Sequence, residues 1–210
     1  MFIRYYLKAL LILVLLTVLN ATVAFAKEQY TGTPIPDFQG IPWRATSADI
    51  EQWASERNAK LANIINRYDG IMTTLIFTGT YAEELAEFRF TLYRGQFYQV
   101  NIYCESIPQS LLIDRWQKFK QLLSQKYGLY SDDFYYFDRP YYKGDGYELQ
   151  AIRLGKGTAK TYWKRPTGNG ENVILDCIIT PYSTLRVGYQ NVEIADVAVD
   201  EFDRLKAKNM

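Results

Sequence analysis

Apolar residues recur at helical spacing in two long stretches of the chain. The first follows Thr46-Ser47-Ala48-Asp49, a sequence typical of a helix start, and repeats every three or four residues from Ile50 to Tyr68. The second begins after Ser106 and ends at Gly128. Its apolar stripe consists of Leu111, Leu112, Trp116, Phe119, Leu122, Leu123 and Tyr127. The pattern therefore predicts two amphipathic helices, and we expect Trp116 and Phe119 to be buried.

Between and after these helices, apolar and polar residues alternate as they do in strands with one buried face. Three such runs follow the first helix and four follow the second. They cover 71–78, 87–93, 97–105, 147–154, 158–164, 172–180 and 185–189. An irregular segment rich in Tyr, Phe and Asp separates the second helix from the last four runs, and a short closing helix is expected over about 196–206.

Short turns join successive runs, so neighbouring strands must pair antiparallel. The sequence thus predicts an α+β fold, an antiparallel meandering sheet with helices packed on one face. We expect a single domain over 38–210, preceded by an extended leader over 27–37. The order of helix followed by strands occurs twice, which suggests two similar halves over 38–105 and 106–210.

Residues 1–26 have the features of a secretory signal peptide. Arg4 and Lys8 precede an apolar run, and Ala24-Phe25-Ala26 matches a cleavage site, so the mature chain is expected to begin at Lys27. The alternative is an uncleaved anchor, because the apolar region approaches the roughly 20 residues that span a bilayer. Thr17, Asn20 and Thr22 weaken that alternative. We therefore expect a periplasmic or secreted protein with no membrane span after signal cleavage.

Composition excludes several classes of function. The 210 residues include 24 Lys and Arg, 23 Asp and Glu and no His, for a net charge of +1. Near neutrality argues against nucleic acid as a partner. The lack of imidazole removes Ser-His and Cys-His nucleophiles and His-containing zinc sites. We expect a protein that is not an enzyme, binds no metal and needs no cofactor.

Cys104 and Cys177 are the only cysteines, and both lie among apolar residues of predicted strands. In an oxidising compartment an even count allows a disulfide, which would stabilise the fold by roughly 3 to 5 kcal/mol. Two buried free thiols are the alternative, and this requires only that their strands are not close neighbours. The sequence leaves both open.

The segment from Ser131 to Gly146 has the densest group of aromatic residues. Tyr135, Tyr136, Tyr141 and Tyr142 are the candidate binding residues, because tyrosine combines a rigid apolar ring with a polar tip. They would recognise a protein partner or stack on sugar rings. The alternative is that these rings fold back and complete the core.

Carboxylates near this segment are candidates for sugar hydrolysis, which requires two acids on either side of the bond. The candidates are Glu105, Asp132, Asp133, Asp138 and Asp145. Nothing in their spacing selects a pair, and it does not match a calcium loop. The glycine-rich segment from Pro166 to Gly170 lacks a following Lys-Ser and helix, so it predicts a hairpin turn and no phosphate site.

The segment Phe38-Gln39-Gly40-Ile41-Pro42-Trp43, the capped helix, the Phe-rich hairpins and Lys126-Tyr127-Gly128 together carry a resemblance. The chain resembles uncharacterised bacterial envelope proteins that begin F-x-G-I-x-W-G, although Arg44 replaces the final glycine. Those are similar to tandem helix-plus-sheet folds of the β-lactamase-inhibitor-like type. The resemblance implies a protein that binds a protein partner or an envelope component. A carbohydrate-binding or carboxylate-based sugar-active protein is the alternative.

Overall fold

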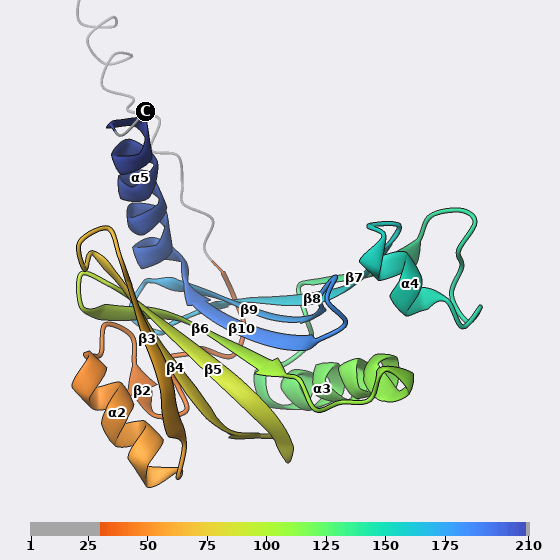
Figure 1. Cartoon of the computed structure of the whole chain (residues 1–210), viewed down its shortest axis with the longest axis horizontal. Helices are drawn as coiled ribbons and strands as arrows, with labels where there is room; N and C mark the ends of the chain where they lie inside the picture. The colour runs from red at the N-terminus through yellow and green to blue at the C-terminus, as the bar shows by residue number, and fades with distance from the viewer. Residues whose placement is uncertain (1–29, 209–210) are drawn as a thin grey trace, which may run out of the picture.

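The computed structural model describes residues 30–208, and the predicted signal peptide over 1–26 lies outside this range. Within it, the chain forms an α+β fold built on an eight-stranded antiparallel sheet, as predicted (Figure 1). The strand order is β3-β4-β5-β6-β10-β9-β8-β7. The strands are β3 (Lys60–Arg67), β4 (Met72–Tyr81), β5 (Glu84–Tyr93), β6 (Gln96–Cys104), β7 (Asp132–Phe137), β8 (Gly157–Pro166), β9 (Asn172–Ile179) and β10 (Leu185–Asn191).

Four α-helices pack against this sheet. They are α2 (Ser47–Glu56), α3 (Leu112–Tyr127), α4 (Glu148–Arg153) and α5 (Val192–Lys208). A 3-10 turn, η1 (Gln109–Leu111), precedes α3, and a small second sheet joins β1 (Asp37–Phe38) to β2 (Ile41–Pro42). In Figure 1, α2 and α3 lie below the sheet and α5 rises above it. None of the helices within residues 30–208 has the length and apolar content needed to cross a membrane.

The elements repeat in order. A helix and four strands, α2 and β3 to β6, are followed by α3 and β7 to β10, and the last strands of the two sets pair antiparallel at the centre of the sheet. Asn101 of β6 lies opposite Gly188 of β10. The strand order of the second set mirrors that of the first across this pair, and α2 and α3 lie on the same face of the sheet (Figure 1).

The main core lies between that face and the helices α2 and α3. Trp116 and Phe119 of α3 are buried, as predicted, while Leu111 and Leu122 of the predicted stripe are exposed because they lie at its margins. Ile35, from the predicted leader, is also fully buried, and its N–H donates to the Pro166 carbonyl. A smaller cluster beneath α5 contains Tyr98, Ile194, Ala195 and Ala198.

The first predicted helix is too long. The helix ends at Glu56, Asn58 adopts a left-handed φ of 54°, and residues 60–67 form the edge strand β3. The apolar residues Leu61 and Ile64 matched helical spacing, but they pair with β4. A short apolar run fits either structure, and here the neighbouring strand decides.

Two further predictions in the second half are wrong. Residues 132–137, expected to be irregular, form β7, and 148–153, expected in a strand, form α4. Alternating aromatics suit the pleated β7. The buried residues of α4, Ala151 and Ile152, are adjacent in sequence and both lie at the contact with β8. An alternating pattern of buried and exposed residues, as in a strand, therefore does not apply to this short helix.

Candidate functional site

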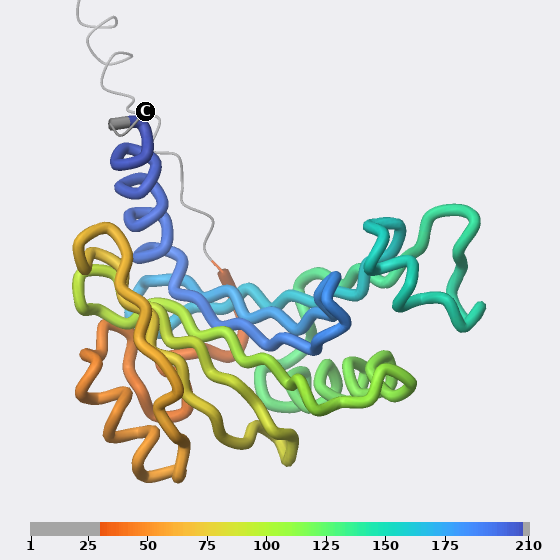
Figure 2. Tube along the Cα trace, viewed as in Figure 1, coloured from red at the N-terminus to blue at the C-terminus, as the bar shows by residue number. Residues whose placement is uncertain are grey.

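The connection between β7 and β8, residues 138–156, carries α4 and projects beyond the end of the sheet (Figure 2). We call this connection the arm. Ala151 and Ile152 are buried at its base, and the N–H of Lys156 donates to the Ala151 carbonyl at 2.8 Å. The arm therefore has a packed base.

The four predicted tyrosines occupy two different environments. Tyr135 is half-buried and packs against Trp116, with ring centroids 5.2 Å apart. Tyr141 is also half-buried, and its hydroxyl accepts a hydrogen bond from Gln150. Tyr136 and Tyr142 are 54% and 67% exposed. Successive residues of β7 point to opposite faces, so Tyr135 lies toward α3 while Tyr136 lies toward solvent.

Other exposed aromatic residues lie close to these positions in the chain. Phe134 precedes the candidate tyrosines on the same face as Tyr136, and Tyr147 follows them in the arm. Among the exposed aromatic side chains of residues 30–208, Tyr182 alone lies outside the span from 134 to 147. The alternation of β7, had the strand been recognised, would have assigned Phe134 and Tyr136 to one face.

Strand β7 forms one edge of the sheet and leaves backbone groups open. All six of its residues pair with β8 without a register shift. The N–H of Asp138 donates to the Lys156 carbonyl, and alternate residues of an antiparallel strand direct their N–H groups to the same side. The N–H groups of Asp133, Tyr135 and Phe137 therefore point away from β8. In the described part of the chain no protein acceptor faces these three groups.

The opposite edge, β3, is different. It contains a register shift between Leu61 and Asn63, and the Asn63 side chain accepts the N–H of Ile64 at 2.8 Å. Lys60 and Arg67 add charges at its two ends. Bulges and charged residues are the devices that prevent an edge strand from pairing with another chain. β3 thus has both a bulge and charges at its two ends, whereas β7 has no register shift and its charges, Asp132 and Asp133, lie together at one end.

Three of the five candidate carboxylates, Asp132, Asp133 and Asp145, have structural partners. Asp133 accepts from Lys120 at 2.9 Å and from Thr161 at 2.7 Å, and Asp132 pairs with Lys164 at 3.3 Å. Asp145 accepts two backbone N–H groups within the arm. Among the described residues, no three His, Cys, Asp or Glu side chains gather closely enough to hold a metal ion.

The two cysteines are free and buried. Cys104 is in β6 and Cys177 in β9, with β10 between them. Two strand spacings are roughly 9 to 10 Å, beyond the roughly 7 Å that a disulfide tolerates between Cα atoms. Burial raises the pKa of the Cys104 thiol to about 12 and that of Cys177 well above its usual range. Of the two alternatives that the sequence left open, a disulfide and two buried free thiols, the structure contains the free thiols.

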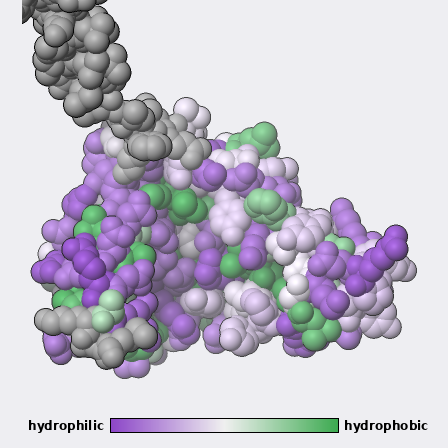
Figure 3. All heavy atoms as spheres, turned by 90° about the horizontal axis from the view of Figure 1, so that it is seen from above, coloured by the Kyte–Doolittle hydropathy of each residue, from purple (hydrophilic) through white to green (hydrophobic). Residues whose placement is uncertain are grey.

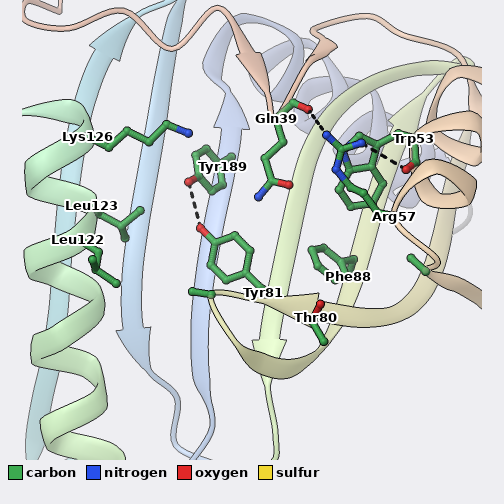
Figure 4. A pocket seen from close by; sticks show the side chains of 12 residues that line it. Gln39, Trp53, Arg57, Thr80, Tyr81, Phe88, Leu122, Leu123, Lys126 and Tyr189 are labelled. Carbon is green, nitrogen blue, oxygen red and sulfur yellow. Dashed lines mark hydrogen bonds between the residues drawn. The ribbon is translucent and has the colours of Figure 1, made fainter.

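A cavity of about 480 Å³ lies between α2 and α3 (Figure 4). Its walls include the rings of Trp53, Tyr81, Phe88 and Tyr189. The hydroxyls of Tyr81 and Tyr189 lie 3.2 Å apart. Burial raises the pKa of both hydroxyls well above the ordinary tyrosine value, so both stay neutral.

Polar groups reach this cavity from α3, from the end of α2 and from the turn between β1 and β2. Lys126 extends from α3 toward Tyr189, and the Gln39 side chain points down between Tyr189 and Arg57 (Figure 4). Gln39 has a left-handed φ of 51°, and its carbonyl accepts from Arg57 at 3.1 Å. The guanidinium also lies 4.9 Å from the centre of the Trp53 ring.

The face from which α5 rises is largely hydrophilic, with hydrophobic residues in small separate groups (Figure 3). Asp176 and Arg186 form an ion pair at 2.6 Å on this side of the sheet. Burial raises the pKa of Asp176 despite the nearby guanidinium. Position 188 requires glycine, because a Cβ there would lie about 3 Å from the carboxylate oxygens of Asp176 and from the side-chain amide oxygen of Asn101. This pair is part of a packed polar layer and offers no open site.

No family model, no curated protein and no solved structure matches this chain. The resemblance to envelope proteins therefore stays a prediction.

Proposed function

We propose that the protein is a periplasmic or secreted, non-catalytic module that binds an extended segment of a protein partner along the edge of β7. The observation that carries this proposal is the open edge, with exposed Phe134 and Tyr136 beside it. The residues of the arm continue this surface past the end of the strand.

An added strand would gain main-chain hydrogen bonds from the outward groups of Asp133, Tyr135 and Phe137. Strand addition to an open sheet edge is a general mode of peptide recognition, in which the backbone gives affinity and alternate side chains give specificity. The edge also has little net charge, because Asp132 pairs with Lys164 and Asp133 pairs with Lys120. A partner strand is therefore not repelled.

Side chains on the exposed face indicate the chemistry of the partner. Every second residue of an added strand would lie beside Phe134 or Tyr136, where aromatic and β-branched residues contribute roughly 0.2 to 1 kcal/mol per cross-strand pair. The partner should therefore be an extended segment with aromatic or β-branched residues at alternate positions.

The test is selection of peptides from a random displayed library on the purified mature protein. We expect selected peptides to alternate apolar and polar residues, and to slow amide hydrogen exchange at Asp133, Tyr135 and Phe137. Tyr136→Lys should weaken binding about tenfold or more, because a charge on an edge opposes pairing. Tyr182→Lys is the matched control, since Tyr182 is also exposed but lies in another loop.

Two outcomes would contradict the proposal. One is a Tyr136→Lys variant that binds selected peptides as tightly as the unaltered protein. The other is protection from exchange at β3 with none at β7. Self-pairing of two β7 strands would show itself as a dimer in sedimentation, which Tyr136→Lys dissociates in the absence of any peptide.

Carbohydrate binding is the second candidate, and the exposure of Tyr142 and Tyr147 in the arm favours it. Their rings could stack on sugars without any contribution from the β7 edge. A glycan array separates the two functions. Sugar binding should be lost in Tyr142→Ala and kept in Tyr136→Lys, the reverse of the pattern expected for peptides.

The proposed location depends on residues 1–26. Arg4, Lys8, the apolar run and Ala24-Phe25-Ala26 favour export and cleavage. Mass spectrometry of the exported protein should find an N-terminus at Lys27. Intact Met1 in the membrane fraction would favour the anchor instead.

A further inference from the structure

The cavity between α2 and α3 combines an aromatic floor with positive charge at its rim. Trp53, Phe88 and Tyr189 supply the floor, and Arg57 and Lys126 come from the two helices on either side. A volume of about 480 Å³ is in the range of small-molecule sites. The cavity therefore has room for a small molecule and presents both aromatic rings and cationic groups to it.

The charges around it favour an anion. Within the part of the chain that the structure describes, the lining contains Arg57 and Lys126 and no Asp or Glu. Glu56 approaches Arg57 at 3.7 Å, while the Lys126 ammonium lies over the Tyr127 ring at 5.0 Å. A ligand's negative group would be attracted to this rim with no carboxylate in the lining to repel it.

One uncharged donor points into the cavity, and a second belongs to a ring of its wall. The Trp53 indole N–H is buried and has no acceptor among the described residues. Gln39 brings its side-chain amide into the cavity from the two-residue turn between β1 and β2, where Gln39 and Gly40 both have the positive φ that this kind of hairpin turn requires.

We infer that this cavity binds a small amphipathic carboxylate, with its apolar body over Trp53, Phe88 and Tyr189 and its carboxylate toward Lys126 and Gln39. The neutral hydroxyls of Tyr81 and Tyr189 lie at the floor and complete the polar contacts. This site lies on the helix-covered face and does not depend on binding at the β7 edge.

The experiment uses three ten-carbon probes that share the same apolar chain: decanoate, decanol and decyltrimethylammonium. Calorimetry measures affinity, and NMR follows the Trp53 indole N–H and the Gln39 side-chain amide. We expect decanoate to bind about tenfold more tightly than decanol, the gain from one charge-assisted contact, and to shift both signals. The cationic probe should not bind.

Variants on α3 test the role of the rim. Lys126→Met should weaken decanoate binding about tenfold, and Lys126→Arg should preserve it. Lys118→Met is the matched control, because Lys118 is an exposed lysine of the same helix outside the lining. Leu122→Trp, which adds a large ring at the lining, should abolish binding without lowering the melting temperature.

Three results would overturn the inference. Decanol binding as tightly as decanoate would remove the role of charge. Equal loss in Lys118→Met and Lys126→Met would indicate attraction to the whole helix surface. Decanoate binding that leaves the Trp53 and Gln39 signals unmoved would place the ligand elsewhere. Peptide binding at β7 is measured separately, so its failure would not affect these outcomes.

Discussion

The two halves of the sheet share an order of elements but differ at their outer hairpins. β3 and β4 are joined by the short connection 68–71, whereas β7 and β8 are joined by the arm, 138–156. β3 is protected by a bulge and charges, while β7 pairs in register and exposes aromatic side chains. The second half thus carries a long connection, packed at its base, that the first half lacks, beside an edge strand without a register shift.

The helices of the two halves also correspond. Each has an isoleucine, a tryptophan three residues later and a cation four residues after that. These are Ile50, Trp53 and the C-cap residue Arg57 for α2, and Ile113, Trp116 and Lys120 for α3. Each cation lies over its tryptophan ring, at 4.9 Å and 4.7 Å. The tryptophans differ in one respect. Trp116 donates to the Cys177 carbonyl at 3.0 Å, whereas the Trp53 N–H lacks a partner and its ring borders the cavity.

The largest expected effect tests the packing of α3. Phe119 is buried against the sheet, so Phe119→Ala should lower the free energy of unfolding by about 3 to 5 kcal/mol. Leu122→Ala on the same helix is the control, because Leu122 is 42% exposed. Chemical denaturation measures both. Equal costs would mean that the two residues share a face of α3, against the structure.

The paired tryptophans sharpen the comparison further. Trp116→Phe and Trp53→Phe remove the same side-chain volume and leave a smaller ring beneath each cation, but only the first removes a hydrogen bond. Trp116→Phe should therefore cost about 1 kcal/mol more in the free energy of unfolding, measured by denaturation. If Trp53→Phe is the more destabilising change, the indole N–H of Trp53 donates to an acceptor outside the protein, such as a bound water.

The sequence predicted the elements whose pattern is long. The stripe of α3 continues over four turns, so its buried residues Trp116 and Phe119 could be read directly. The run after Asn58 was too short for this. Leu61 and Ile64 fit either period, and pairing with β4 determines the strand. Such pairing is a contact between distant residues and leaves no local signal.

The candidate sites were harder to predict for the same reason. The sequence identified the aromatic segment, but which rings are exposed depends on Tyr135 packing against Trp116 from another element. The cavity could not be found at all. Gln39, Trp53, Tyr81, Lys126 and Tyr189 come from separate parts of the chain and meet only when α2 and α3 lie on one face.

A smaller effect concerns how the two helices begin. α2 starts with a capping box, in which the Thr46 hydroxyl accepts the Asp49 N–H and the Asp49 carboxylate accepts the Thr46 N–H at 2.7 Å. α3 follows η1 and has no side-chain cap. Thr46→Ala should lower the free energy of unfolding by about 1 kcal/mol. Ser110→Ala, just before α3, should leave it unchanged within error.

The smallest effect is the pH dependence of this cap. Hydrogen bonds from Thr46, first from its backbone N–H and then from its hydroxyl, lower the pKa of Asp49 below the ordinary aspartate value. A lowered pKa in the folded state means that the cap stabilises the protein above the ordinary aspartate pKa, and that this contribution is lost as pH falls through the folded value. The difference in stability between the unaltered protein and Asp49→Asn should therefore be constant near neutral pH and shrink in acid. Urea denaturation of both proteins at a series of pH values measures it. A difference that grows as pH falls would mean that the Asp49 carboxylate opposes folding, and the capping box would then not distinguish α2 from α3.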